Sequence, residues 1–259
     1  MGPAAPADRP GPGRRRRCRH QPRGTPIRPR PFTASYKEKL LCSRLDATTT
    51  LSQALAVAAA ADPGRPRILL SASAVGYYGD TGARTVTEQD PAGTDFLAQL
   101  CAQWEAATGP AEAAGVRVVH LRTGLVLDRR AMLVQILGRV FRLGLGGRMG
   151  TGRQYWPWIS LTDQVGAIRH LLAVDVSGPV NLTGPAPATN AEFTRELARQ
   201  VHRPAVLPVP AFAINLALGE FGRSSVTAGQ RAMPVRLEES GYRFTHADLE
   251  SALRAATAR

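Results

Sequence analysis

Four hydroxyl side chains around one short apolar segment are the residues of this chain that are best placed to do chemistry. Residues 68–72 form an apolar run that contains Ser71, and Ser73, Tyr77 and Tyr78 follow it. An apolar run that ends at glycines predicts a buried strand and then a tight turn. Ligands of open α/β sheets bind beyond the carboxyl ends of the strands, where hydroxyls can bind a substrate oxygen or move a proton. The alternative is that the serines only cap the turn.

Hydrophobic spacing along the rest of the chain predicts the elements that position this strand. A long helix, or two helices, begins at Thr33 and ends at residues 62–64. Further helices are expected over 96–107, 132–143, 162–172 and 189–201, and further strands over 116–121, with 126–127 as a prolongation, and over 180–182. We expect Thr162 to cap its helix and Thr189 to form a capping box with Glu192. Strands that alternate with helices predict an α/β fold with a parallel sheet and crossover helices.

Composition divides the chain into three parts. Residues 1–31 are almost entirely Pro, Gly and Arg and have no hydrophobic periodicity, so we expect them to be disordered. Residues 32–203 hold the alternating strands and helices. Residues 204–259 begin with several prolines, and a helix over 211–221 and a last helix opened by Thr245 predict a small α+β region there.

The formal net charge of +13 is concentrated near the N-terminus. Residues 1–44 carry 12 Lys and Arg against two acids, whereas residues 45–259 carry 21 against 18. A basic arm can bind nucleic acid, but this arm has no interleaved aromatic residues. We therefore expect no nucleic-acid partner.

Several classes of protein are excluded by composition. No apolar run reaches the roughly 18 residues of a membrane-spanning helix, and the first residues lack the apolar core of a secretory signal. The cysteines, Cys18, Cys42 and Cys101, lie far apart and form no metal-ligand pattern. We therefore expect a cytoplasmic protein with no membrane contact and no bound metal.

A glycine-rich segment at 144–152 is the one candidate for phosphate binding that the spacing suggests. It lacks the G-x-G-x-x-G pattern and follows a helix, whereas a dinucleotide site needs a strand, a glycine turn and a helix N-terminus. We interpret it as a flexible loop, close to a substrate. The aromatic cluster of the chain, 155–158, comes directly after it.

A set of collinear segments resembles the short-chain dehydrogenase/reductase superfamily. More narrowly, it is similar to the atypical, epimerase-like branch related to sugar-nucleotide epimerases, which ends in a small domain of the DUF1731 type. The resemblance covers about residues 32–258. The segments are SASAVGYYG, DFLAQLCAQWEAA, VRVVHLRTGLVL, FRLGLGGRMGTGRQYWPWISLTDQVGAI, GPVNLTGPAPATNAEFTRELA and LEESGYRF.

The resemblance implies a Rossmann-type domain over 32–203 that binds NADP or NAD, and a small-molecule substrate of the nucleotide-sugar type. Ser73 matches the serine that hydrogen-bonds the reacting oxygen of the substrate, and Tyr77 and Tyr78 are candidate acids. Positions that match cofactor contacts are Arg44, Ser71, Ala72, Arg122, Thr123 and Gly124. Positions that match substrate contacts are Arg153, Gln154 and Trp156.

Two departures from the superfamily pattern bear on activity. The usual acid–base pair is Tyr-x-x-x-Lys, in which the ammonium lowers the pKa of the tyrosine, but Leu97 and Cys101 occupy those positions. The second departure lies at the N-terminus, because residues 1–31 do not resemble the strand, glycine turn and helix with which the family begins. We therefore expect only a partial Rossmann domain without its pyrophosphate cradle, in which strand 67–72 exposes an apolar edge.

Three hypotheses follow. The first is an NAD(P)-linked oxidoreductase or epimerase, for which NADPH fluorescence should rise on binding. The second is a catalytically inactive family member that acts as a binding protein, and a chain that is molten, aggregates or forms a homodimer would support it. The third is nucleic-acid binding through residues 1–31, which deletion of that segment should abolish.

Overall fold

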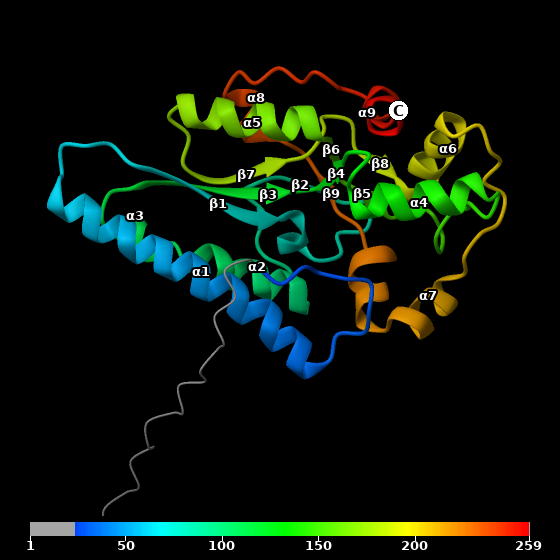
Figure 1. Ribbon diagram of the computed structural model, residues 1–259, viewed down its shortest axis with the longest axis horizontal. Helices are drawn as coiled ribbons and strands as arrows, with labels where there is room; N and C mark the ends of the chain where they lie inside the picture. The colour runs from blue at the N-terminus through cyan, green and yellow to red at the C-terminus, as the bar shows by residue number, and fades with distance from the viewer. Residues whose placement is uncertain (1–23, 259) are drawn as a thin grey trace, which may run out of the picture.

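The computed structural model describes residues 24–258, and its centre is a three-stranded parallel sheet (Figure 1). The strands stand in the order β1-β3-β7, with bounds β1 (Ile68–Ala74), β3 (Arg117–Thr123) and β7 (Gly178–Leu182). The register pairs Leu70 with Val119, and Leu121 with Val180. Parallel neighbours need crossover connections, which helices supply here. The predicted α/β class with a parallel sheet is therefore confirmed.

Helices cover both faces of this sheet (Figure 1). On one face lie α1 (Ala34–Ala61), α2 (Phe96–Ala106) and α3 (Gly109–Ala113), and on the other lie α5 (Leu161–Ala173) and α8 (Val235–Glu239). Neighbouring residues of β3 face opposite layers: Val118 packs with Leu69 and Ala111, whereas Val119 packs with Leu171. Strands that are buried on both sides read as continuous apolar runs, which is why this part of the sequence was predicted as strand.

Side-chain caps explain where most helices begin. Thr33 accepts a hydrogen bond from the Tyr36 amide at the start of α1, and Asp95 accepts one from Ala98 at the start of α2. The predicted capping box of Thr189 and Glu192 is present at the start of α6 (Asn190–Gln200). Each cap satisfies an amide that the first turn of a helix leaves without a partner.

Two predicted helix starts are wrong. Ser160, not Thr162, caps α5 by accepting a hydrogen bond from the Asp163 amide. The last helix, α9 (Leu249–Thr257), begins later than predicted and is capped by Asp248, whose carboxylate accepts from the Ser251 amide at 2.8 Å. Thr245 lies before this helix, where its amide donates to the carboxylate of Asp163 at 2.7 Å.

Smaller strand pairs and helices lie beside the carboxyl ends of the central strands (Figure 1). The pairs are β2 (Thr85–Val86) with β9 (Arg231–Ala232), β4 (Leu125–Leu127) with β6 (Trp158–Ser160), and β5 (Tyr155–Trp156) with β8 (Ala188–Thr189). The remaining helical elements are a 3-10 turn at Val75–Tyr78, α4 (Met132–Arg142), α7 (Ala211–Leu218) and a π-helical turn at Gly222–Val226. The predicted prolongation of β3 at 126–127 is thus a separate strand, β4, which pairs with β6.

The C-terminal region shares its core with the preceding segment. Leu253 of α9 lies in one hydrophobic cluster with Leu137 of α4, Phe193 of α6 and Trp158 of β6. Residues 204–259 therefore pack on the body of the protein, and the division at residue 203 stays a prediction.

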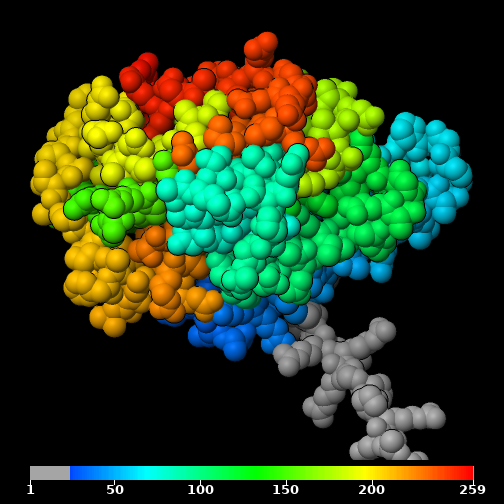
Figure 2. Space-filling model, turned by 180° about the vertical axis from the view of Figure 1, so that it is seen from behind, coloured from blue at the N-terminus to red at the C-terminus, as the bar shows by residue number. Residues whose placement is uncertain are grey.

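The N-terminal part of the described chain lies along α1. The Tyr36 hydroxyl donates to the Pro26 carbonyl at 2.7 Å and accepts from the Arg28 amide at 2.9 Å. Of the segment that we expected to be disordered, residues 24–31 thus contact α1, and residues 1–23 lie outside the described part. At the other end of α1, the last turns project from the body of the molecule (Figure 2).

Strand β1 stands at the edge of the central sheet. Within residues 24–258, only β3 pairs with it. Ile68 is 37% exposed and Ala72 is also exposed, in agreement with the predicted apolar edge. None of the helices in the described part of the chain is long and apolar enough to cross a membrane.

Candidate functional site

A buried ion pair lies where β1 and β3 end. Arg122 stands opposite Ser73 in the parallel register, and its guanidinium binds Glu105 of α2 through two bonds of 2.9 Å. The Ser73 hydroxyl donates to the same carboxylate at 2.6 Å. Ser73, Glu105 and Arg122 are 5%, 8% and 3% exposed. Two-point pairing of this kind holds both groups rigidly, so the Ser73 hydroxyl is committed to Glu105 rather than to a ligand.

Tyr78 extends this network toward β7. Its hydroxyl donates to Asn181 Oδ1 at 2.7 Å and accepts from Arg122 Nη1 at 3.0 Å. Burial raises the pKa of Tyr78 to about 12, although Arg122 opposes the shift. Tyr78 therefore stays protonated at neutral pH and is poorly suited to act as a base.

Glu88 connects the network to the C-terminal region. Its Oε1 atom accepts from the amides of Asn181 at 3.0 Å and Arg236 at 3.3 Å. Burial raises the pKa of Glu88, and these amide hydrogen bonds partly offset the rise. Because Asn181 contacts both Tyr78 and Glu88, the polar groups form one connected structure that crosses the sheet.

Tyr77 is the third predicted catalytic residue, and its environment is different. The Arg122 guanidinium carbon lies 3.4 Å from the centre of the Tyr77 ring, which is cation–π geometry. The side chain is half-buried, and its hydroxyl takes no part in the hydrogen bonds that hold Ser73 and Tyr78. Of the three candidates, Tyr77 is thus the one whose hydroxyl is not held in this network, and its catalytic role stays a prediction.

The positions that match the superfamily's acid–base pair are apolar and buried. Leu97 and Cys101 are 9% and 3% exposed, on the face of α2 that packs against α1. Burial raises the pKa of the Cys101 thiol to about 12, so it is not a thiolate at neutral pH. That these two residues stand in place of the tyrosine–lysine pair stays a prediction.

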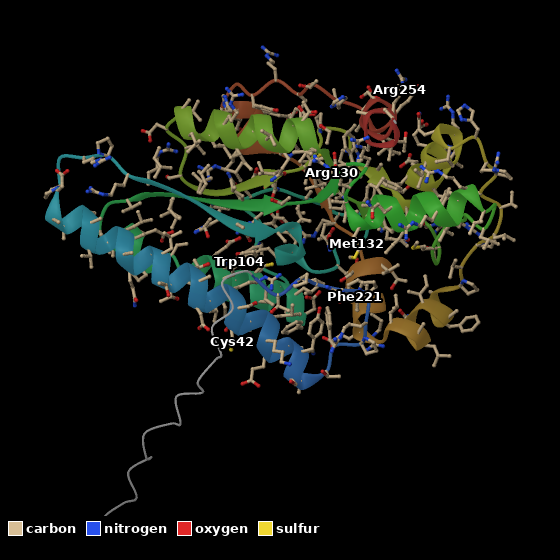
Figure 3. The ribbon with its side chains drawn as sticks, in the orientation of Figure 1. Cys42, Trp104, Arg130, Met132, Phe221 and Arg254 are labelled. Carbon is tan, nitrogen blue, oxygen red and sulfur yellow. The ribbon has the colours of Figure 1, made fainter. Side chains whose placement is uncertain are left out.

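The predicted cofactor residues are separated by the fold. Arg44 of α1 donates to the carbonyls of Leu40 and Thr25 and lies 5.0 Å over the ring of Trp104, which Figure 3 shows between α1 and α2. Burial lowers the pKa of its guanidinium. The other positions are at the ends of β1 and β3: Ser71 and Arg122 are buried, Thr123 is half-buried and Ala72 is exposed.

Two glycines of the predicted site segments are packed against protein rather than open to a phosphate. A Cβ atom on Gly124, after β3, would lie 2.5 Å from the Pro157 carbonyl oxygen, and one on Gly147, in the 144–152 loop, would overlap the Leu207 carbonyl. A phosphate cradle needs glycine amides that face open space beside a helix N-terminus. The predicted role of Gly124 as a cofactor contact stays a prediction, while its packing role is evident from this close approach.

The predicted substrate residues have three different environments. Arg153 is exposed, and Gln154 is buried because its amide donates to the Met149 and Val226 carbonyls at 2.9 and 3.1 Å. Trp156 lines a cavity of about 460 Å³, which we call the α4/α7 pocket. The pocket lies between α4, α7 and the segments that follow β3, and Figure 3 shows Met132 and Phe221 on its two sides.

The α4/α7 pocket is almost entirely apolar. Its lining includes Leu125, which begins β4 directly after the end of β3, and Ser225 is its one hydroxyl among the described residues. The indole Nε1 of Trp156 is buried and has no hydrogen-bond partner within residues 24–258. An unsatisfied buried donor costs about 1–3 kcal/mol. The ring of Trp156 lines the pocket, whereas its Nε1 atom is buried beneath the lining.

Sequence reasoning missed Glu105, Glu88 and Asn181, which organise the site. One signal was available: Glu105 lies eight residues after Leu97, on the same apolar face of α2, where a carboxylate needs a partner. Within the described part of the chain, no group of His, Cys, Asp and Glu residues could hold a metal ion.

The parallel sheet and its two helical layers define a Rossmann-type α/β protein. Residues 209–256 match the family model described as "Domain of unknown function (DUF1731)". The chain is 48% identical over 237 residues to epimerase family protein MT2273 of Mycobacterium tuberculosis, covering 91% of this chain and 77% of that protein. It is 35% identical over 229 residues to epimerase family protein SDR39U1 of Bos taurus, covering 87% and 76%.

Solved structures agree with this relationship. The crystal structure of human epimerase family protein SDR39U1 with NADPH has a TM-score of 0.81 and 30% identity, and the match covers 88% of this chain and 76% of that one. UDP-glucuronic acid 4-epimerase from Bacillus cereus with NAD has a TM-score of 0.67 at 14% identity over 88% of this chain and 68% of that one, which shows the shared fold. This chain belongs to the epimerase family.

Proposed function

We propose that this chain binds a small molecule with an apolar body in the α4/α7 pocket, as a protein of the NAD(P)-linked epimerase and oxidoreductase type. Support comes from the position of Leu125, which joins the pocket to the carboxyl end of β3, where ligands of such sheets bind. The lining of Met132, Leu133, Ile136 and Trp156 suits an aromatic or alkyl skeleton better than a sugar rich in hydroxyls.

The unpartnered indole nitrogen of Trp156 is the observation that carries this proposal. Nε1 is buried, so a ligand oxygen would reach it when the Trp156 ring turns toward the cavity. A carbonyl or hydroxyl oxygen that then accepts from Nε1 would satisfy the donor and orient the ligand in an otherwise apolar cavity. The substrate class that we propose is therefore an apolar compound with one acceptor oxygen, such as an aryl or alkyl ketone.

A nicotinamide cofactor, NADP or NAD, is implied by the family. When bound, such a cofactor accepts or donates a hydride. The exposed Ala72 and the half-buried Thr123 leave room for a ring over the ends of β1 and β3, but the glycines of the described chain that pack against carbonyls offer no cradle for its pyrophosphate. The fit is thus incomplete within residues 24–258, and we assign no reaction step to the cofactor.

Ligand binding can be tested with 4-fluoroacetophenone, whose ¹⁹F NMR signal should broaden and shift as it enters the pocket. Trp156→Phe should weaken its binding but leave 4-fluoroethylbenzene, which lacks the oxygen, almost unchanged. Trp104→Phe is the matched control, because the Trp104 indole already donates to Thr48 at 2.9 Å outside the pocket. Equal binding of both probes to wild type and Trp156→Phe would contradict the assigned role of the indole.

A second candidate function is a binding protein without catalysis. It is favoured by the hydrogen bonds that commit Ser73 and Tyr78 to the network, and by the apolar pair Leu97 and Cys101. The two functions differ in a direct assay: NADPH oxidation with a panel of ketones, comparing wild type with Tyr77→Phe. Turnover that Tyr77→Phe abolishes supports an enzyme, whereas ketone binding without turnover supports the second function.

A further inference from the structure

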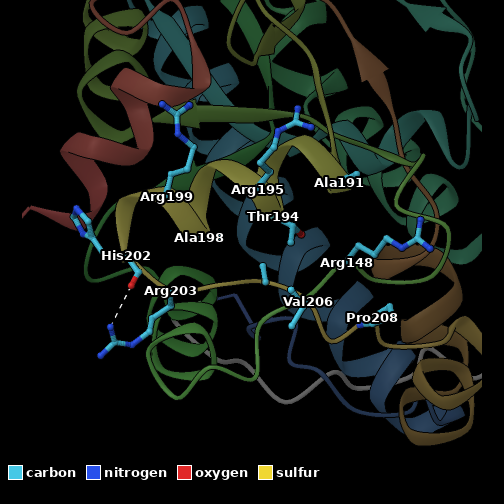
Figure 4. Close-up of a pocket in the computed structure, with 11 residues that line it drawn as sticks. Arg148, Ala191, Thr194, Arg195, Ala198, Arg199, His202, Arg203, Val206 and Pro208 are labelled. Carbon is cyan, nitrogen blue, oxygen red and sulfur yellow. Dashed lines mark hydrogen bonds between the residues drawn. The ribbon is translucent and has the colours of Figure 1, made fainter.

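A second cavity of about 750 Å³ lies outside the site described above, between α6 and residues 204–208. We call it the arginine groove. Its charged lining comes from Arg148, Arg195, Arg199 and Arg203, together with His202, and no carboxylate among the described residues lines it. Figure 4 shows Arg195 and Arg199 leaving the same side of α6. Arg148 belongs to the neighbouring loop, where its Nη1 atom donates to the Thr151 carbonyl at 3.4 Å.

The arrangement of these arginines is unfavourable in the free protein. Arg195 and Arg199 are four residues apart on one helix, and like charges at that spacing repel each other. Two neighbouring acids reduce the repulsion: Glu196 pairs with Arg199 at 3.0 Å, and Glu192 lies within electrostatic reach of Arg195. The Arg199 side chain is 65% exposed, so its pair is weak. Like charges held together beside a cavity favour an anionic ligand.

The backbone conformation of His202, which also lines the groove, is a second unfavourable feature. His202 has a φ of 52°, and it is the one non-glycine residue of the described chain in the left-handed region. Glycine is the usual residue where a helix ends in this way. Here the position holds a side chain that lines the groove instead.

The uncharged lining of the groove suits a small anionic molecule better than a single-stranded nucleic acid. The lining includes small apolar side chains, of which Ala198 is buried at the floor and Val206 and Pro208 are exposed at the rim. No Phe, Tyr or Trp of the described chain lines it, although single-stranded nucleic acids are held by stacking on such rings. A cavity of this volume lies within the range of small-molecule sites.

We propose that the arginine groove binds a nucleoside polyphosphate, with its phosphates on Arg148, Arg195 and Arg199 and its base on the apolar floor. Guanidinium groups bind phosphate oxygens through paired hydrogen bonds. The site is separate from the α4/α7 pocket: Arg148 and Pro208 line the groove, whereas the next residues, Met149 and Val209, line the pocket. Consecutive residues of extended chain point to opposite sides, so the two cavities lie back to back.

The test uses ATP as the probe and the full chain, in calorimetric titrations. Arg195→Ala/Arg199→Ala should weaken ATP binding by about 10-fold or more, because two charge-assisted contacts are lost. The matched control is Arg130→Ala/Arg254→Ala, which removes the same charge from side chains that are 75% and 65% exposed outside the groove. It should change the affinity by less than about 2-fold, since it removes only unspecific attraction.

A second measurement locates the bound nucleotide without substitutions. Phenylglyoxal modifies accessible arginines, and ATP should protect Arg195 and Arg199 in the mass spectrum of the digest but not Arg254. Inorganic pyrophosphate should protect them only at higher concentration, because it makes no contact with the floor.

Three results would overturn the proposal. ATP binding that does not saturate, or that weakens equally in both double variants, would show general attraction to basic side chains, including the block Arg14 to Arg17. Tighter binding of a 12-nucleotide oligothymidylate than of ATP, lost in Arg195→Ala/Arg199→Ala, would show a nucleic-acid site instead. The Trp156→Phe variant should bind ATP as wild type does, so this test is independent of the proposed pocket function.

Discussion

Removal of the Glu105 carboxylate is expected to destabilise the protein more than any exposed ion-pair substitution. In Glu105→Gln, the Arg122 guanidinium keeps its charge but loses both bonds of 2.9 Å to a carboxylate, and Ser73 loses a charged acceptor at 2.6 Å. The remaining partners of Arg122 are the Tyr78 hydroxyl and the Glu88 carbonyl. Breaking a buried ion pair on one side costs about 3–5 kcal/mol.

Thermal unfolding followed by circular dichroism measures this loss. For a chain of this size, each kcal/mol lowers Tm by roughly 2–4 °C, so Glu105→Gln should melt roughly 6–20 °C below wild type. Glu250→Gln is the control, because Glu250 pairs with Arg254 on the surface of α9, where the two side chains are 46% and 65% exposed. That pair should contribute less than about 1 kcal/mol.

A double substitution tests the same ion pair in a second way. Replacing both charges, in Glu105→Leu/Arg122→Met, should cost less than the sum of the two single substitutions, since neither charge is then left buried alone. If Glu105→Gln fails to yield folded protein, Ser73→Ala removes one arm of the network and should cost about 1–2 kcal/mol. Melting of Glu105→Gln within about 2 °C of wild type, or additive costs in the double variant, would refute the assigned role.

Three further predictions concern other parts of the fold. Gly124→Ala should lower Tm by several degrees, because the added Cβ atom would lie 2.5 Å from the Pro157 carbonyl oxygen. Gly109→Ala is the control and should leave Tm unchanged, because its Cβ atom would meet nothing within 4 Å. Equal melting of the two variants would contradict the packing argument. Burial disfavours the ionised form of Asp163, but four hydrogen bonds to its carboxylate outweigh this and lower its pKa. The ionised carboxylate therefore stabilises the fold above the ordinary pKa of about 4, and this stabilisation is lost as pH falls below that value. Acid unfolding of Asp163→Asn should lack that part of the transition. Burial raises the pKa of Tyr78 to about 12, above the ordinary value near 10. The protonated phenol therefore contributes its full stabilisation below pH 10, and this contribution is lost as pH rises toward 12. A phenolate absorbance step near pH 12 that persists in Tyr78→Phe would contradict this assignment.

Sequence reasoning succeeded where a local rule was sufficient. The helix that begins at Thr33 and the capping box of Thr189 depend on residues within one turn, and both are present. It failed at the last helix, where Thr245 and Asp248 both offer a side-chain oxygen and Asp248 is the residue that caps the first turn. The Thr245 amide is held before the helix by Asp163, 82 residues earlier.

The candidate site shows the same division. Ser73 and Tyr78 are at the carboxyl end of β1, as their place after an apolar run predicted. Whether their hydroxyls were free for catalysis could not be read from that place, because Glu105 and Asn181, which bind them, come from α2 and β7. The role of each predicted residue therefore depends on partners that lie 32 and 103 residues away.

By itself, the sequence determined the parallel α/β fold and the membership of the epimerase family, because both depend on the order of apolar and polar residues along the chain. Tertiary structure alone decided which polar groups are paired and which are available. Pairing depends on the distance between atoms of separate elements, and burial makes an unpaired group costly. For that reason Ser73 is held by Glu105, while the buried Trp156 indole nitrogen is left without a hydrogen-bond partner in the described chain.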